Sequence, residues 1–500
     1  MCVPKGLKQH DAVSTNPSHR NGVEITVIEQ GRLRASFGRW RAILQEAAQG
    51  FRLWHHGMLV PALRRPWASP RPSNNGAARY LVGAEEFSGL GKLAFACLWL
   101  LVFAIPWEDA VTISDFGTSA RVIGMLTGGL GVLAIIERGR VRRPAPGHIM
   151  MALFVMLKAL SYLWSLYPEG TLTQAFTYMQ LFTMVWLIWE LCPQALEQTR
   201  LMQAYILGTF VSGIDTVYQF LSHQESVYQR YAGAGLDAND LGLIMALSIP
   251  VSYYLLIQSK GRMVWLYRLH LVLAGTTILL TASRGATLAT LVALAIVPMT
   301  HARLTGRQKL TVLLTISLLV FGALLFVPST SWERLSTMPG EFAQGTLTGR
   351  TVIWKAGWEL FRGHPFLGVG ANAFRLTVSR VLAEPIRPDQ TGRPWTPAAH
   401  NTFLSVLVEQ GVIGFALFCG LLGVLALSLR AMPPFPQKLW IVCLGVWVVG
   451  VSSLSWEMRK PTWFFFGLLM AQCGSMAQKR STQRHAPSLA EAQLSFLRAS

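Results

Sequence analysis

The sequence predicts an all-α polytopic membrane protein with about twelve transmembrane helices and one large outer loop that contains short helices. Three observations predict this fold class. Charged residues make up 14% of the chain, against roughly 25% in an average globular protein, while 52% of the residues are hydrophobic. The apolar residues come in blocks of about 16 to 22, which is the length that a helix needs to cross a bilayer. Basic residues gather in alternate connecting loops.

The apolar blocks fall into two groups, one on each side of a long polar stretch. Nine blocks lie within residues 89–327 and three within 401–478. Since each block is long enough for a bilayer, each predicts one transmembrane helix. The expected helices lie at about 90–106, 120–136, 147–165, 172–191, 201–221, 237–257, 264–281, 286–302, 309–327, 401–428, 438–456 and 461–477.

The charges of the short loops predict the orientation of the chain. The 137–147 loop carries four arginines and the 303–309 loop two arginines and a lysine, whereas the 107–119 loop carries three carboxylates and no base. Because Lys and Arg concentrate in cytoplasmic loops, both termini are expected in the cytoplasm. The same bias accounts for much of the formal charge of +19. We therefore expect membrane lipids, and no nucleic acid, as partners.

The two ends of the chain are expected to be cytoplasmic tails, residues 1–88 and 479–500. The spacing of apolar and basic residues over about 36–55 predicts a basic amphipathic helix that lies on an anionic inner leaflet. The alternatives are a disordered tail or an upstream start that the cell does not use, with Met58 as the next methionine. The first 30 residues lack the apolar core of a cleavable signal peptide. The apolar face of the expected helix consists of Phe37, Trp40, Leu44, Ala47, Phe51 and Trp54.

The segment 328–400 is expected to form the large outer loop, and a loop of that length without a function is uncommon. It contains GRTVIWKAGWELFRGHPFLGVGANAF, residues 349–374, in which Trp354, Trp358 and Phe361 share one helical face. The His-Pro pair that follows predicts the end of this helix. The GVGAN run is not followed by the GK[ST] of a phosphate-binding loop. None of the six cysteines lies in this loop, so no disulfide framework is expected.

Ionisable residues inside membrane helices are candidates for function by default. On the predicted topology Lys158, Asp215, Asp240 and Glu409 all fall in the outer halves of their helices. This depth favours a polar cavity that opens to the outer face, whereas a transporter would place such groups near the midplane. Each residue also has a structural interpretation, such as a snorkelling lysine or a carboxylate that binds a neighbouring helix. Glu409 is expected to line the cavity or to pair with one of the bases.

Three residues on the outer side form the predicted catalytic set. Arg284 lies in the turn TASRGATL, Arg350 begins the loop helix, and His400 lies where the chain re-enters the membrane. Arginine offers a fixed fork of donors that grips a phosphate or diphosphate at two points. Histidine exchanges a proton near neutral pH, and a helix N-terminus favours its neutral, basic form.

A second set of polar residues is predicted to bind substrate. Asn401, Ser405 and Glu409 recur four residues apart, as a polar stripe that runs inward from His400. No metal ion or other cofactor is expected, because His364, His400 and Glu409 lack a familiar ligand spacing. The substrate-binding candidates are Asn401, Arg362, Lys355, Asp240 and Glu457.

Two of these motifs resemble those of the O-antigen ligase family. His400-Asn401, nine residues, Gly411, two residues and Gly414 are similar to the family signature H-[NSQ]-x9-G-x-x-[GTY], and Arg284 to Leu288 are similar to its R-x-x-x-L motif. The stretch 349–374 also resembles the segment before the histidine in O-antigen ligases and polymerases. The resemblance covers about residues 90–478 and is strongest over about 230–415.

This resemblance implies a metal-independent membrane glycosyltransferase of the bacterial inner membrane. Such enzymes take a glycan from a polyprenyl (undecaprenyl) diphosphate carrier on the periplasmic face and transfer it to a hydroxyl of lipid A-core or of another glycan. Arg284 and Arg350 would then stabilise the departing diphosphate. His400 would accept the proton of the acceptor or hold the diphosphate. Glu457 would be the acidic residue of the last outer turn, unless it is an ordinary interface charge.

The resemblance leaves two functions open within lipopolysaccharide or surface polysaccharide biosynthesis. A ligase joins the glycan to lipid A-core, and an O-antigen or exopolysaccharide polymerase extends another glycan. A third alternative, from another class, is a lipid-linked glycan flippase or other twelve-helix transporter. The single large loop, the outer-half charges and the lack of an obvious internal repeat argue against a transporter.

Overall fold

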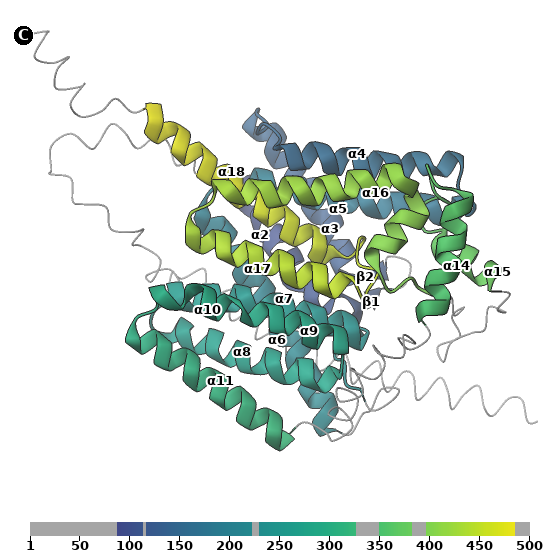
Figure 1. The fold of residues 1–500 in the computed structure, drawn as a ribbon. Coiled ribbons are helices and arrows are strands. Elements are labelled where there is room, and N and C mark those ends of the chain that lie inside the picture. Colours follow the sequence, from purple (N-terminus) through teal and green to yellow (C-terminus); the bar gives the residue numbers. More distant parts are fainter. Residues whose placement is uncertain (1–87, 114–116, 223–229, 327–349, 383–396, 486–500) are drawn as a thin grey trace, which may run out of the picture. The chain divides into compact units, whose positions relative to one another are not determined.

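The computed structural model describes residues 88–113, 117–222, 230–326, 350–382 and 397–485. The chain divides into two compact units, and the larger one, residues 79–258 and 262–500, holds all the elements named below. Apart from one hairpin of two short strands, the regular structure of the described residues is helical. The predicted all-α fold is therefore confirmed at this level (Figure 1).

The elements before the large loop form the first part of the bundle. They are α2 (Gly89–Ala104), the 3-10 helix η4 (Ile105–Ala110), β1 (Thr112–Ile113), β2 (Gly117–Thr118), α3 (Ser119–Arg138), α4 (Pro146–Leu160), η5 (Ser161–Leu163), α5 (Pro168–Leu191), α6 (Ala195–Leu221), α7 (Ala238–Gln258), α8 (Arg262–Thr281), α9 (Arg284–Leu294), α10 (Ile296–Thr300), η6 (His301–Arg303) and α11 (Gly306–Phe326). The antiparallel strands β1 and β2 pair Thr112 with Thr118 and Ile113 with Gly117.

The remaining elements come from the large loop and the C-terminal part of the chain. They are α14 (Arg350–Gly363), α15 (Phe374–Val381), α16 (Thr402–Ser428), η8 (Leu429–Ala431), α17 (Pro434–Val451) and α18 (Lys460–His485). Figure 1 shows α14 and α15 together at one end of this unit, beside the first residues of α16. The predicted loop helix that begins at Arg350 is thus present as α14.

A helix lies over each of the twelve predicted segments. Among the described residues, seven helices are long and apolar enough to cross a membrane: α2 with η4, α3, α4 with η5, α7, α8, α16 with η8, and α17. That the other helices also cross the membrane stays a prediction, and so does the periplasmic placement of the loop. The predicted amphipathic helix of the N-terminal tail lies outside the described residues.

The helix boundaries follow from local capping. Ser88 caps α2 by accepting a hydrogen bond from the backbone N–H of Gly91 at 3.1 Å. Gly139 ends α3 in a left-handed conformation with φ of 66°, which a glycine adopts without strain. In the bundle α7 is buried along nearly its whole length, and α8, α9 and α17 pack against it. Helix α16 packs against α4, and α5 against α18.

Helix α16 differs from the continuous helix that its apolar sequence predicts. Gly411 has φ of 60° and ψ of −167°, a conformation open essentially to glycine alone, and it breaks the helix after its first three turns. The loop after α14 enters the break. The backbone N–H groups of Val369 and Gly370 donate to the carbonyls of Val408 and Glu409, both at 3.0 Å.

The backbone N–H groups on the other side of the break also form hydrogen bonds to this loop. Val412 and Ile413 donate their backbone N–H groups to the carbonyls of Pro365 and Phe366, at 2.8 and 3.3 Å. A Cβ atom on Gly368 would lie 2.4 Å from the carbonyl carbon of Glu409, so only glycine allows this approach. The GVGAN run therefore fastens α14 to α16, a role in packing rather than in phosphate binding.

Candidate functional site

The site is built around His400, immediately before α16. The segment that carries it is held by a small apolar cluster shared by α14, α15 and the first part of α16, in which Phe374, Val378 and Val408 are buried. The indole N–H of Trp354 in α14 donates to the carbonyl of Ala399 at 2.8 Å. The loop helix and the residue before His400 are thus connected directly.

The backbone at His400 is unusual. Its φ of 45° lies in the left-handed region, which a residue with a Cβ atom occupies at a cost of roughly 1–3 kcal/mol and which often marks a functional site. The next residue, Asn401, caps α16 by accepting from the backbone N–H of Leu404 at 3.0 Å. The cap occupies the side-chain oxygen of Asn401, so this substrate-binding candidate positions the helix that follows His400.

The electrostatic surroundings of His400 include two arginines and one carboxylate. The pKa of the half-buried imidazole is lowered to about 4, mainly by burial and also by the nearby positive charge of Arg350. The carboxylate of Asp237 acts in the opposite direction and Arg375 in the same direction as Arg350. His400 is consequently neutral at pH 7, and the structure brings the predicted pair of His400 and Arg350 into electrostatic contact.

Arg284, the third predicted catalytic residue, is the first residue of α9 and is half-buried. The turn before it is fixed by Asn239 at the start of α7, whose side-chain oxygen accepts from Ser283 and from Arg230, both at 2.9 Å. Arg230 also donates to the carbonyl of Thr281 at 2.9 Å. Asn239 in turn donates its backbone and side-chain N–H groups to Asp237, so hydrogen bonds connect the Arg284 turn to the carboxylate near His400.

Asp240 is buried rather than open to a substrate. Its carboxylate accepts from the indole N–H of Trp456 at 2.8 Å and forms an ion pair with Arg459. The backbone N–H of Trp456 donates to Thr402 at 2.7 Å, at the start of α16. Asp240 therefore holds the last turn, residues 452–459, against the helix that follows His400.

Glu457 lies in the same turn, and its residue is 4% exposed, so it is not an interface charge. One carboxylate oxygen accepts from Ser405 at 2.8 Å, and the other has no hydrogen-bond partner among the described residues. Burial raises the pKa of Glu457, against the opposing effect of Lys158. Lys158 itself pairs with Glu409 at 2.8 Å, so of the two alternatives for Glu409 the pairing with a base is observed.

The last two substrate-binding candidates, Lys355 and Arg362, are exposed on α14. They are free to meet a large substrate, but no described contact connects them to His400. Among the described residues no three His, Cys, Asp or Glu side chains gather in a way that would hold a metal ion.

Three residues near His400 and Arg284 were not predicted from the sequence: Asp237, Arg230 and Arg375. Asp237 precedes Asp240 by three residues, and the pattern D-A-N-D at the start of an apolar block is a helix-capping signal. That signal predicts a helix start but not proximity to a histidine more than 160 residues away. Arg230 and Arg375 lie in polar stretches without a distinguishing pattern.

Comparison with known proteins gives two likenesses. A family model described as O-antigen ligase matches residues 269–419, which include Arg284, Arg350 and His400. The exopolysaccharide production protein ExoQ of Rhizobium meliloti (strain 1021) is 22% identical over 344 residues, which cover 67% of this chain and 74% of that protein. The predicted resemblance to the O-antigen ligase and polymerase family is confirmed.

Proposed function

We propose, from this likeness to O-antigen ligases, that the chain is a polyprenyl-diphosphate-dependent glycosyltransferase. The observation that carries the proposal is the pairing of a neutral His400 with Arg350 inside the matched region 269–419. The enzyme takes a glycan from the lipid carrier and joins it to an acceptor hydroxyl, lipid A-core in the case of a ligase. It lies in the bacterial inner membrane with cytoplasmic termini, and the site faces the periplasm.

The proposed reaction is a single displacement at the anomeric carbon. The acceptor oxygen forms a bond to that carbon while the bond to the diphosphate oxygen breaks. His400 accepts the proton of the acceptor hydroxyl, for which its neutral state is required. Negative charge grows on the leaving diphosphate, and the half-buried guanidinium groups of Arg350 and Arg284 stabilise it. No step calls for a metal ion.

Alanine at His400 or Arg284 tests this assignment. Loss of a general base or of a leaving-group cation lowers the rate by roughly 100-fold or more. Transfer would be measured in membrane vesicles with a lipid-linked glycan donor, alongside the amount of folded protein. His364→Ala and Arg380→Ala change the same residue types at exposed positions outside the site and are expected to keep full activity. Full activity of His400→Ala would remove that residue from the mechanism.

The likeness to an exopolysaccharide production protein supports a second candidate function, that of a polymerase. Both functions use the same donor and the same chemistry and differ in the acceptor. The transfer assay separates them by the product. A ligase attaches the glycan once to a lipid acceptor, whereas a polymerase gives a ladder of products that differ by one repeat unit.

The pH dependence of transfer distinguishes the two roles left open for His400. If neutral His400 is the base, kcat/KM stays constant from about pH 8 to 5 and falls as the imidazole is protonated near pH 4. If protonated His400 holds the diphosphate, the rate instead rises toward pH 4. Arg350→Gln removes a positive neighbour and should move the titration to higher pH. Asp237→Asn removes a negative neighbour and should move it to lower pH, and shifts of opposite sign would contradict the assignment.

A further inference from the structure

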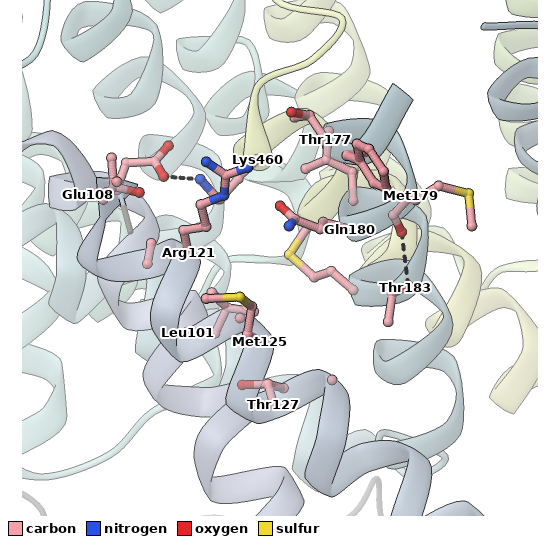
Figure 2. Close-up of a pocket in the computed structure, with 18 of the residues that line it drawn as sticks. Leu101, Glu108, Arg121, Met125, Thr127, Thr177, Met179, Gln180, Thr183 and Lys460 are labelled. Carbon is pink, nitrogen blue, oxygen red and sulfur yellow. Dashed lines mark hydrogen bonds and ion pairs between the residues drawn. The ribbon is translucent and has the colours of Figure 1, made fainter. Parts of the chain in front are cut away.

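A cavity of about 500 Å³ lies between α2, α3, α5 and the turn before α18. Figure 2 shows its lining, with Glu108, Arg121 and Lys460 at one end and Met125 and Thr127 further along α3. The proposed transfer reaction makes no use of this cavity. Its apolar wall consists of Leu101, Met125, Phe176, Met179, Met184 and Leu187.

The part of the cavity between α3 and α5 is lined mainly by apolar side chains and opens at the surface of the helix bundle. The hydroxyls of its three helical threonines are bonded within their own helices, Thr127 to the carbonyl of Ile123 at 2.7 Å, Thr177 to that of Thr173 at 3.1 Å and Thr183 to that of Met179 at 2.8 Å. They therefore present little polarity to an occupant. Phe176 and Met179 are 60% and 52% exposed, which in a membrane helix means contact with lipid chains.

The polar end carries one cation that binds no carboxylate of the described residues, Arg121. Glu108 forms an ion pair with Lys460, and Asp109 lies 3.8 Å from Arg459, which also binds Asp240. Arg121 is exposed at this end, and within the described residues it has no hydrogen bond or ion pair. Because arginine binds phosphate through a fork of donors, the end of the cavity suits a phosphate group.

We propose that this cavity binds an anionic phospholipid of the surrounding bilayer, with its phosphate on Arg121 and one acyl chain between α3 and α5. The volume of about 500 Å³ fits a single hydrocarbon chain. The exposed guanidinium of Arg121 favours an anionic lipid over a zwitterionic one. The occupied cavity adjoins Met458, Arg459 and Lys460, so a bound lipid packs directly against the turn that holds Trp456 and Glu457.

The test uses the full chain in vesicles of phosphatidylcholine with a minority of phosphatidylglycerol that carries a photoreactive group on one acyl chain. Crosslinked peptides would be identified by mass spectrometry. Phosphatidylglycerol is expected to label α3 and α5 at residues such as Met125 and Met179. Gly128 lines the cavity, and a Cβ atom on it would meet nothing within 4 Å, so Gly128→Leu fills the cavity without a backbone clash. This variant is expected to lose the labelling.

The matched control is Gly129→Leu, on the same helix with equally open space but outside the cavity lining. It should keep the labelling. Arg121→Gln, at an exposed position, should lower the preference for phosphatidylglycerol over phosphatidylcholine about fivefold. The proposal is overturned by equal labelling in Gly128→Leu and Gly129→Leu, by no lipid preference in the unmodified chain, or by competition from polyprenyl phosphate and not from phosphatidylglycerol. None of these outcomes depends on glycan transfer.

Discussion

Gly411→Ala is expected to abolish glycan transfer and to lower the thermal stability of the protein in detergent. The left-handed backbone of Gly411 would strain an alanine by roughly 1–3 kcal/mol. A Cβ atom would also lie 2.2 Å from the carbonyl oxygen of Phe366, and backbone cannot yield as a flexible side chain does. The loop must therefore leave the break in α16. Because the same loop fastens α14, Arg350 would move relative to His400.

The control for this variant is Gly423→Ala on the same helix, where a Cβ atom would meet nothing within 4 Å. Alanine favours helix over glycine by roughly 1 kcal/mol, so this change should leave transfer intact and raise the melting temperature slightly. Melting would be followed by tryptophan fluorescence and transfer by the vesicle assay. Normal activity and stability of Gly411→Ala would contradict the described break.

Lys158→Met is expected to destabilise the protein by roughly 3–5 kcal/mol, which is the usual cost of leaving a buried charge without its partner. The Lys158 side chain is fully buried and lies 2.8 Å from Glu409, and its ammonium group lies 5.3 Å from the ring centre of Tyr178. Without it, Glu409 and Glu457 remain as two buried carboxyl groups close to one another. Thermal melting of the purified variant measures the effect.

The double variant Lys158→Met with Glu409→Leu provides the comparison for this prediction. It removes both members of the pair and is expected to recover part of the lost stability, because two apolar side chains replace two buried charges. The interaction energy from the two single variants and the double variant isolates the pair. Additive losses would show that Lys158 and Glu409 do not stabilise each other.

The apolar blocks of the sequence predicted the positions of the helices, since hydrophobic length alone determines where a helix can cross a bilayer. They did not predict the break in α16, because the apolar run continues on both sides of Gly411. A glycine inside such a run also fits close packing of two helices. The backbone of Gly411 is set by a loop about 45 residues earlier, and local sequence carries no record of that contact.

Only part of the candidate site was predicted, again because local sequence does not record contacts between distant segments. His400, Arg284 and Arg350 stand out because each is an ionisable residue at the end of an apolar or aromatic helix. The charged groups that shift the pKa of His400 come from separate segments, Asp237 at the start of α7 and Arg375 in α15. Asp240 and Glu457, two predicted substrate-binding residues, are buried, and their carboxylates bind neighbouring protein groups. Their burial depends on packing between segments, which the sequence of one segment does not specify.

The loop inserted into α16 has a consequence for the class of chemistry that this helix supports. In secondary transporters, broken helices bind ions through unwound carbonyls and bind substrates at exposed half-helix ends. Here the carbonyls of Val408 and Glu409 and the N–H groups of Val412 and Ile413 are all bonded to the loop. These four backbone groups are therefore not available to an ion or a substrate. The break thus joins α16 to the segment between α14 and α15 through backbone hydrogen bonds.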